Sequence, residues 1–357
     1  MKMNHTLFRI LLIIALLPFS MTACNPNEKT PLVIFAAGSL IGPFGELEKG
    51  FEQKYPNIDI TPEYHGSIQV IRHTTDLHLK TDVIVTADHA LIPDLMYEVN
   101  DPETGKPYAN WAMRFATNSL GLAYTENSKY ADEITPENWL DIIAKPEVRV
   151  GIADPRFDPS GYRSLMVVKL AETFYQKPYL FSDLFAGQFR FPLKVEENDG
   201  YDLIKVPEVL EVKGGAHIVI RGASIQLLAL LESGDLDYAF EYESVIRQHD
   251  LKYLPLPDEL NLGKEEYNSF YDKVKVKMDF QRFTAVNPEF SGEQIGYGIT
   301  IPSNALHPKE AGLFIAYLLG PEGRKIMDDY YHPVFEKIQT DRAENVPASL
   351  QSLLSIP

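Results

Sequence analysis

The chain has 357 residues, 45% of them hydrophobic, which is enough for two domains that each bury an apolar core and argues against intrinsic disorder. Its formal net charge is −17, and its Lys and Arg residues form no basic cluster, so the composition argues against a nucleic-acid partner. A protein with this charge would have to hold an anionic ligand by local dipoles.

The first residues are typical of an export signal. Lys2 and His5 precede the apolar run 7–17, and small residues then lead to Cys24, the only cysteine in the sequence. The run is too short for an ordinary membrane-spanning helix, and a single cysteine cannot form an internal disulfide. We therefore predict a signal peptide at 1–23.

Cys24 is the candidate lipidation site. Residues 21–24 resemble a bacterial lipobox, with Met21 where leucine is commoner, and this implies that Cys24 becomes the first mature residue and carries acyl chains. The polar stretch 24–30 is then a lipidated tether. An uncleaved anchor would leave the same folded part outside the same membrane. In both cases we predict a protein of the cell envelope, exported to the periplasm or outer surface.

After the tether, strands and helices alternate along the chain. The apolar run 32–37 ends at Gly38-Ser39, and a helical pattern follows. The strand 58–64 ends in the same way at Gly66-Ser67, and its helix leads to the buried strand 82–86. This alternation predicts a parallel sheet.

The second half repeats the pattern with strands at 148–153, 217–221 and 238–242. Near the end, 297–301 reads as a further strand. An amphipathic helix follows it and ends at Gly320, and we expect this helix to return to the first lobe.

These patterns predict an α/β fold of two lobes, each with a parallel or mixed sheet covered by helices, joined by a hinge. The first lobe would comprise 31–114 and 303–357, and the second lobe 115–302. Two polar segments of the second lobe, near 176–215 and 251–293, lack a clean period. We expect both to be insertions.

Predicted strand ends in both halves are followed by Gly or Ser at the start of a helix. They are Gly38-Ser39, Gly66-Ser67, Pro159-Ser160-Gly161 and Gly222-Ala223-Ser224. The first N–H groups of a helix lack intrahelical partners and carry about half a positive charge, so such ends bind oxyanions. Open α/β sheets also place their ligands at the carboxyl ends of strands. The alternative is that Ser39, Ser67, Asp158 and Ser224 only cap their helices.

The same residues carry a resemblance to a known family. The segments are 35–40 (FAAGSL), Gly66-Ser67, 158–163 (DPSGYR), 230–244 (LLESGDLDYAFEYES) and 297–302 (YGITIP). Together they resemble the molybdate/tungstate-binding proteins of ABC importers, especially the tungstate-binding branch. The likeness extends over about 32–326 and lapses in the two expected insertions.

The resemblance implies a periplasmic-binding-protein-like fold of type II with the anion between the lobes. It implies a monomer that works with the permease and ATPase subunits of an ABC importer and that takes molybdate or tungstate as ligand, with no cofactor. The family's ligand positions fall on Gly38, Ser39, Ser67, Asp158, Pro159, Ser160 and Tyr242.

The sequence departs from this family at Ser224. In the tungstate branch a glutamate at this position helps an aspartate to ligate the metal directly, and a serine cannot supply that carboxylate. Asp158 would then either bind the molybdenum or tungsten centre or cap its helix, with Pro159 at the first helical position. A carboxylate that faces the anion's oxygens is repelled unless it bonds the metal or is protonated. If Ser224 donates a hydrogen bond instead, tetrahedral binding by neutral donors is expected.

Tyr242 is expected to donate its phenolic O–H to the anion, and packing at the hinge is the alternative. Strand periodicity predicts that Glu241 and Glu243 point away from the ligand. We expect the hinge to be formed by linking strands near 115–124 and Tyr242. Arg163 lies one turn inside its helix, so an ion pair is its expected role.

Other functions find weaker support in the sequence. The nine histidines show no metal-ligand spacing, and no Gly-x-Ser-x-Gly motif is present, so we predict no enzymatic activity. A protein of the same fold could instead bind sulfate or phosphate. Ferric ion is a further alternative because Tyr330 and Tyr331 are adjacent, although their place at a helix end favours aromatic packing.

Overall fold

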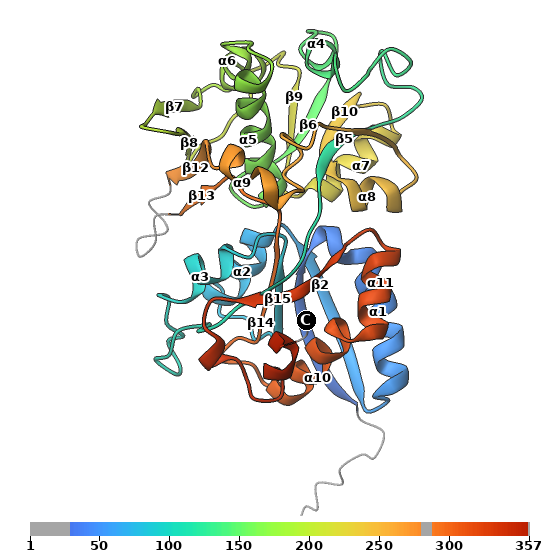
Figure 1. The fold of residues 1–357 in the computed structure, drawn as a ribbon, viewed down its shortest axis with the longest axis vertical. Coiled ribbons are helices and arrows are strands. Elements are labelled where there is room, and N and C mark those ends of the chain that lie inside the picture. Colours follow the sequence, from blue (N-terminus) through green and yellow to red (C-terminus); the bar gives the residue numbers. More distant parts are fainter. Residues whose placement is uncertain (1–28, 280–287, 356–357) are drawn as a thin grey trace, which may run out of the picture.

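The structure is a computed structural model that describes residues 29–279 and 288–355. The predicted signal peptide, Cys24 and most of the predicted tether lie outside the described residues. Within them, two large sheets form the centres of two lobes, and a third, smaller sheet lies beside the second (Figure 1). Among these residues, none of the helices combines the length and the apolar character needed to cross a bilayer.

The first lobe is built on a six-stranded mixed sheet in the order β15-β4-β14-β3-β1-β2. Its strands are β1 (Thr30–Ala37), β2 (Ile58–His65), β3 (Val83–Thr86), β4 (Met113–Ala116), β14 (Tyr297–Thr300) and β15 (Val334–Thr340). The strands β1, β2 and β3 are parallel to one another. β14 is antiparallel to β3, β4 is antiparallel to β14, and β15 is antiparallel to β4. β3 consists only of buried residues, as expected for a parallel strand covered on both faces.

Helices cover the two faces of this sheet (Figure 1). They are α1 (Ile41–Lys54), α2 (Ser67–Thr75), α3 (Leu91–Met96), α10 (Pro308–Leu319) and α11 (Pro321–Asp329). Phe44 and Phe51 of α1 pack edge to face on Phe314 of α10. The last helices of the chain therefore return to the first lobe, as the amphipathic pattern predicts.

The second lobe is built on a five-stranded sheet in the order β11-β5-β10-β6-β9. Its strands are β5 (Leu120–Tyr124), β6 (Val150–Ala153), β9 (Ile218–Arg221), β10 (Tyr238–Tyr242) and β11 (Lys252–Pro255). β6 is parallel to both of its neighbours, β9 and β10. β5 pairs antiparallel with β10 on one side and with β11 on the other. The helices around it are α4 (Trp139–Ile143), α5 (Pro159–Phe174), α7 (Leu228–Glu232) and α8 (Glu243–Gln248).

The two polar segments that we expected to be irregular insertions form a sheet together. Its order is β13-β12-β8-β7, with β7 (Lys194–Glu197) and β8 (Asp202–Pro207) from the first segment and β12 (Val274–Asp279) and β13 (Glu289–Ser291) from the second. The parallel pair β8–β12 joins the segments, and Ile204 and Val276 are fully buried. The short helices α6 (Leu180–Leu184) and α9 (Asn268–Tyr271) complete this region.

The chain crosses between the two large sheets at two places. One crossing is 117–119, between β4 and β5, inside the range expected for the hinge. The other crossing follows β13 and leads through 292–296 into β14. Because β14 pairs with β3 and β4, the return to the first sheet lies before Tyr297 rather than at residue 303. Tyr242 ends β10 inside the second sheet and lies in neither crossing.

Candidate ligand-binding site

Each of the predicted helix starts follows the carboxyl end of a strand. In the first lobe, β1 leads into the short 3-10 helix η1 (Gly38–Leu40), and β2 leads into α2 at Ser67. In the second lobe, a loop from β6 leads into α5 at Pro159, and β9 leads into η3 (Ser224–Leu227). Because β1–β2 and β6–β9 are parallel pairs, the two starts of each lobe lie at the same edge of its sheet.

The two lobes meet at these helix starts. The backbone N–H of Ile68 donates to the carbonyl of Phe157 in the other lobe at 3.1 Å. A Cβ atom on Gly66 would lie 2.4 Å from that same carbonyl oxygen, so the approach requires a glycine there. Gly38 faces Ile225 of η3, whose Cγ2 would be 3.4 Å from a Cβ atom on Gly38. The structure therefore shows the lobes closed on each other, with all the helix starts together.

Ser39 and Ser67 of the first lobe are buried, and neither side chain caps its helix. Ser67 Oγ accepts from the backbone N–H of Ala87 at 2.9 Å. Ser39 Oγ shares a hydrogen bond of 2.8 Å with the hydroxyl of Tyr297, which also accepts from Asn118 Nδ2 at 3.1 Å. Either hydroxyl can donate in the bond between Ser39 and Tyr297, whereas Ser67, whose oxygen accepts from Ala87, keeps its own hydroxyl hydrogen for another partner.

Asp158 caps α5, so the capping interpretation holds for this residue. Its Oδ1 accepts from the N–H of Ser160 at 2.9 Å, and its Oδ2 accepts from the N–H of Ser224 at 3.1 Å. Pro159 occupies the start of the helix. Burial raises the pKa of the Asp158 carboxyl, against the two backbone hydrogen bonds that lower it. The side chain thus joins the starts of α5 and η3, and both of its oxygens are engaged within the protein.

The two serines of the second lobe differ in what they can offer a ligand. The hydroxyl of Ser160 is completely buried and has no hydrogen-bond partner. Ser224, in contrast, gives its N–H to Asp158 and its hydroxyl hydrogen to Glu241 Oε1 at 3.0 Å. We expected Ser224 to donate to the anion, but the structure engages both of its hydrogens with carboxyl groups. Its place in the site is to hold Asp158 and Glu241.

Glu241 lies inside this cluster, so the expectation that it points away from the site is wrong. Its side chain is completely buried, and Oε1 accepts from Ser224 and from the N–H of Tyr242 at 2.7 Å. Alternation along β10 does place Glu241 and Tyr242 on opposite faces. Helices cover both faces of the sheet, however, so neither face leads to solvent. Burial, followed by the charge of Asp158, raises the pKa of Glu241 to about 8.

Tyr242 has a fully buried hydroxyl that accepts from Arg163 Nη1 at 2.8 Å. Burial raises the pKa of Tyr242 well above its ordinary value, so the phenol stays neutral. Because its oxygen already accepts from Arg163, its own hydrogen remains for donation. The hydroxyls of Ser67 and Tyr242 therefore share one arrangement, in which the oxygen accepts within the protein and the hydrogen remains for another partner.

Arg163 forms the ion pair that we expected, and its partner lies in the other lobe. Its Nη2 is 3.0 Å from Asp88 Oδ2, and its Nη1 also donates to the carbonyl of Ala87 at 2.7 Å. Both charged side chains are buried. Tyr162 donates to the same Asp88 carboxylate. Arg163 thus links Tyr242 of the second lobe to the end of β3 in the first.

Comparison with known proteins decides the family. Residues 32–331 match the model of the family described as bacterial extracellular solute-binding protein. The chain belongs to this family. Solute-binding proteins are exported components of importers, and they pass a small ligand to membrane and ATPase subunits.

The solute-binding protein has close relatives over nearly its whole length. It is 37% identical to an uncharacterised solute-binding protein of Staphylothermus marinus, with 94% of this chain and 93% of the relative covered. It is 35% identical to the molybdate/tungstate-binding protein WtpA of Thermococcus kodakarensis, with 93% and 90% covered.

Solved structures confirm the fold of the solute-binding protein as a type II periplasmic-binding fold. The sulfate-binding protein SubI of Mycobacterium tuberculosis matches with a TM-score of 0.55 at 11% identity, covering 92% of both chains. The periplasmic molybdate-binding protein of Azotobacter vinelandii matches with a TM-score of 0.50 at 13% identity, covering 84% of this chain and 98% of the other.

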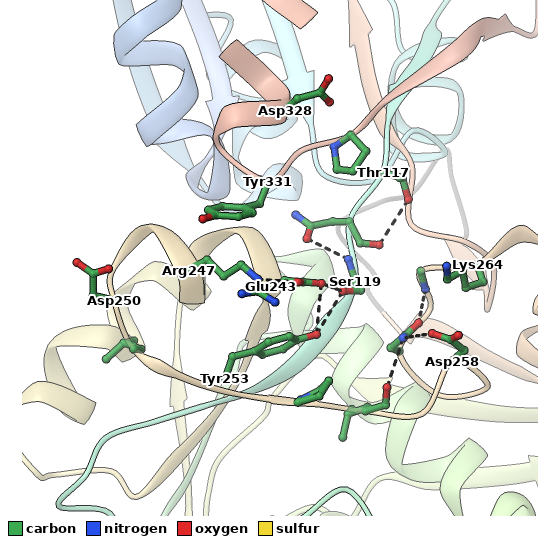
Figure 2. Close-up of a pocket in the computed structure, with 17 residues that line it drawn as sticks. Thr117, Ser119, Glu243, Arg247, Asp250, Tyr253, Asp258, Lys264, Asp328 and Tyr331 are labelled. Carbon is green, nitrogen blue, oxygen red and sulfur yellow. Dashed lines mark hydrogen bonds and ion pairs between the residues drawn. The ribbon is translucent and has the colours of Figure 1, made fainter. Parts of the chain in front are cut away.

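Two of the hollows between the lobes of the solute-binding protein lie next to the start of η1 and next to the crossing at 117–119. The smaller has a volume of about 200 Å³ and is bordered by Gly38, Ser39 and Ile225. The larger, of about 1140 Å³, follows the crossing at 117–119, and no predicted site residue lines it. Figure 2 shows Asp328 and Tyr331 on one side of this larger hollow and Arg247 with Glu243 on the other. Arg247 and Glu243 are paired with each other, with Arg247 Nε donating to Glu243 at 2.7 Å.

Sequence reasoning missed Tyr297, Asn118 and Glu241 as parts of the site. Tyr297 opens β14, and its hydroxyl joins Ser39 of the first lobe to Asn118 of the crossing. Asn118 Nδ2 also donates to Ser244 Oγ of the second lobe at 2.7 Å. The motif YGITIP contained the signal for Tyr297, whereas nothing local to the sequence marks Asn118.

Proposed function

We propose that this solute-binding protein captures a tetrahedral oxyanion, molybdate or tungstate, between its lobes and delivers it to the permease and ATPase subunits of an ABC importer. The observation that carries the proposal is the convergence of helix starts and spare hydroxyl hydrogens from both lobes. Its chemistry suits a dianion, because neutral dipoles and hydroxyl donors bind an oxyanion without a matching cation. The identity of 35% to a protein named for molybdate and tungstate binding supports the choice of anion.

In this proposal each lobe contributes part of the anion's shell. The first lobe supplies the start of η1, with Gly38 and Ser39, and the hydroxyl of Ser67. The second lobe supplies the start of α5, with Pro159 and the unpartnered Ser160 hydroxyl, and the phenol of Tyr242. A ligand that contacts both lobes favours the closed form over the open form by its extra contacts.

The engagement of both Asp158 oxygens by backbone N–H groups favours tetrahedral binding. Asp158 then has the task of orienting the starts of α5 and η3. A direct bond from Asp158 to the metal would need a free Asp158 oxygen, and Ser224 stands where the tungstate branch carries the glutamate that completes six-coordination. We therefore propose that the metal keeps its four oxygens and that the protein provides hydrogen bonds alone.

Sulfate is the second candidate, because it is also a tetrahedral dianion and the same donors suit it. Ferric ion is disfavoured by the surroundings of the tyrosine pair. The guanidinium of Arg247 lies 5.5 Å from the ring centre of Tyr331, so a cation already occupies the space next to it.

Calorimetric titration of residues 25–357 with molybdate, tungstate, sulfate and phosphate, each in turn, tests the proposal. We expect one-to-one binding of molybdate and tungstate, and weaker or no binding of the smaller anions. A preference for sulfate or phosphate would reassign the ligand while keeping the site. If none of the four anions binds, the proposed function is wrong.

We also propose that Cys24 carries the lipid anchor, on the basis of the lipobox-like residues before it. Full-length protein expressed in a bacterial host should fractionate with membranes, and its mature N-terminus should have the mass of an acylated cysteine. Cys24→Ser should release the protein from the membrane fraction. An N-terminus that starts elsewhere, or unchanged fractionation of the variant, would contradict the anchor.

A further inference from the structure

Glu241 has one carboxyl oxygen to which no group of residues 29–279 and 288–355 donates. Oε1 accepts two hydrogen bonds, from Ser224 Oγ at 3.0 Å and from the N–H of Tyr242 at 2.7 Å. Oε2 is buried and has no hydrogen-bond partner. The residue as a whole has no exposed surface. An unpaired buried polar atom of this kind is uncommon and calls for a partner that the protein alone does not supply.

The hydrogen-bond pattern places a proton on Oε2. Two donors make Oε1 the carbonyl oxygen of a carboxylic acid, whereas an ionised Oε2 would be a buried negative atom without any donor. Asp158 is the neighbouring carboxylate, and each of its oxygens has a backbone N–H. Both carboxyl groups accept two hydrogen bonds, but only in Asp158 does each oxygen have a donor, so Asp158 keeps the charge of the pair and the proton stays on Glu241. Glu241 is therefore the neutral member of the pair.

The other ionisable groups on the elements around Glu241 are Asp158 and Arg163 of the α5 region, Tyr242 of β10 and Tyr297 of β14. Arg163 forms its ion pair with Asp88 of the other lobe. Burial raises the pKa of both tyrosines far enough that they stay neutral. Glu241, with a pKa raised to about 8, is the member of this cluster that changes charge in mildly alkaline solution.

Glu241 belongs to the hydrogen-bonded group that forms the second-lobe half of the proposed site. It contacts Ser224, at the position of the absent glutamate, and Ser224 is tied through Asp158 to the N–H of Ser160. The phenol of Tyr297, which contacts Ser39 of the first lobe, lies within electrostatic range of the Glu241 carboxyl group. The carboxyl group is therefore bonded to the second lobe and lies near the first lobe at Tyr297.

We propose that Glu241 is a further anion-binding residue, which acts as a carboxylic acid and donates the hydrogen on Oε2 to an oxygen of the bound anion. This inference rests on the proposed function. It explains why Ser224 gives its own hydroxyl hydrogen to Glu241, since that bond leaves the acid's hydrogen on the other oxygen.

A hydrogen-bond donor at Glu241 distinguishes anions by whether they carry a proton. Molybdate, tungstate and sulfate are fully ionised near neutral pH and offer only acceptors. Hydrogen phosphate carries a proton that needs an acceptor, which the acid form of Glu241 does not provide. The site should therefore favour fully ionised oxyanions over phosphate, for a reason independent of their size.

The proposal also fixes the sign of the pH dependence. The anion binds the form in which Glu241 is protonated. The affinity for the anion is therefore constant below the pKa of Glu241 in the ligand-free protein, at about 8, and falls above it. The expected loss is about tenfold for each pH unit above that value, because one proton must be taken up with each anion. Molybdate and tungstate do not titrate in this range, so the protein is the source of the effect.

The test is calorimetric titration with tungstate between about pH 7 and about pH 9.5, in two buffers of different ionisation enthalpy. We expect no proton uptake at the lower pH and uptake approaching one proton per anion at the higher pH. Glu241→Gln keeps a neutral donor, so it should bind tungstate at neutral pH and lose the pH dependence. The control is Glu243→Gln, two residues further on, which pairs with Arg247 outside the site and should behave as the wild type.

The outcomes separate the inference from the function on which it rests. If the wild type binds none of the oxyanions, the proposed function is wrong and the inference is wrong with it. If tungstate binds with the same affinity at both ends of the pH range and without proton uptake, Glu241 is not the donor, and the oxyanion function stands. Should Glu241→Gln fail to fold, the proton uptake of the wild type decides the question alone.

Discussion

Replacement of Gly66 by alanine tests whether the closed arrangement of the lobes is the binding state. Gly66 has φ −60° and ψ 140°, which alanine adopts without strain, so the first lobe should fold normally. The added Cβ would lie 2.4 Å from the carbonyl oxygen of Phe157 and 2.9 Å from its carbonyl carbon. Both atoms belong to the backbone of the other lobe and cannot rotate away.

The size of the effect follows from this geometry. Ordinary contact begins near 3.4 Å, so the lobes must separate by about 1 Å at this point. The bond from Ile68 to Phe157, now 3.1 Å, would then lengthen beyond the hydrogen-bond range. Misplacement of even one donor to a charged ligand costs about 1.5–3 kcal/mol, which corresponds to a loss of affinity of roughly 10- to 150-fold.

The assay compares anion affinity by calorimetry with the melting temperature of the ligand-free protein. Gly66→Ala should lose affinity and keep its melting temperature, because the clash lies between lobes that can open. Gly45→Ala is the matched control, since no atom lies within 4 Å of its added Cβ inside α1. It should keep its affinity and gain about 0.5–1 kcal/mol in stability as a helical alanine. Wild-type affinity in Gly66→Ala would refute the closed arrangement as the binding state.

Three further predictions concern the hydroxyl donors, the ion pair between the lobes and a buried histidine. Ser39→Ala and Ser67→Ala should each weaken anion binding by about 1.5–3 kcal/mol in calorimetry, and unchanged affinity in both would contradict the site. Asp88→Asn leaves the buried guanidinium of Arg163 without its ion pair in the closed form, so small-angle scattering with saturating anion should show a more open molecule than the wild type; identical curves would contradict this. Burial lowers the pKa of His332 to about 4, so the folded state holds this ring neutral and should lose up to about 3 kcal/mol of stability as the pH falls from about 6.5 to about 4. Urea unfolding should show a weaker loss in His332→Gln over the same range, and equal losses would exclude His332 as the cause.

The predicted elements succeeded where the pattern is local. The strand runs, the Gly-Ser turns after them and the amphipathic last helices lie in the structure as the sequence indicates. The polar segments did not, because β8 and β12 form a sheet by pairing with each other, and the paired residues Ile204 and Val276 are 72 residues apart in the chain. When a strand is stabilised by a partner that is distant in the chain, the hydrophobic periodicity of its own sequence can be too weak to predict it.

The candidate site divides in the same way. The sequence by itself determined the helix starts and made Asp158 a candidate cap, because a cap and its N–H partner lie within a few residues of each other. Only the tertiary structure decided that Glu241 faces inward, that Arg163 pairs with Asp88, and that Tyr297 holds Ser39. Strand alternation says which side chains share a face, but what covers that face depends on chain segments that are remote in sequence.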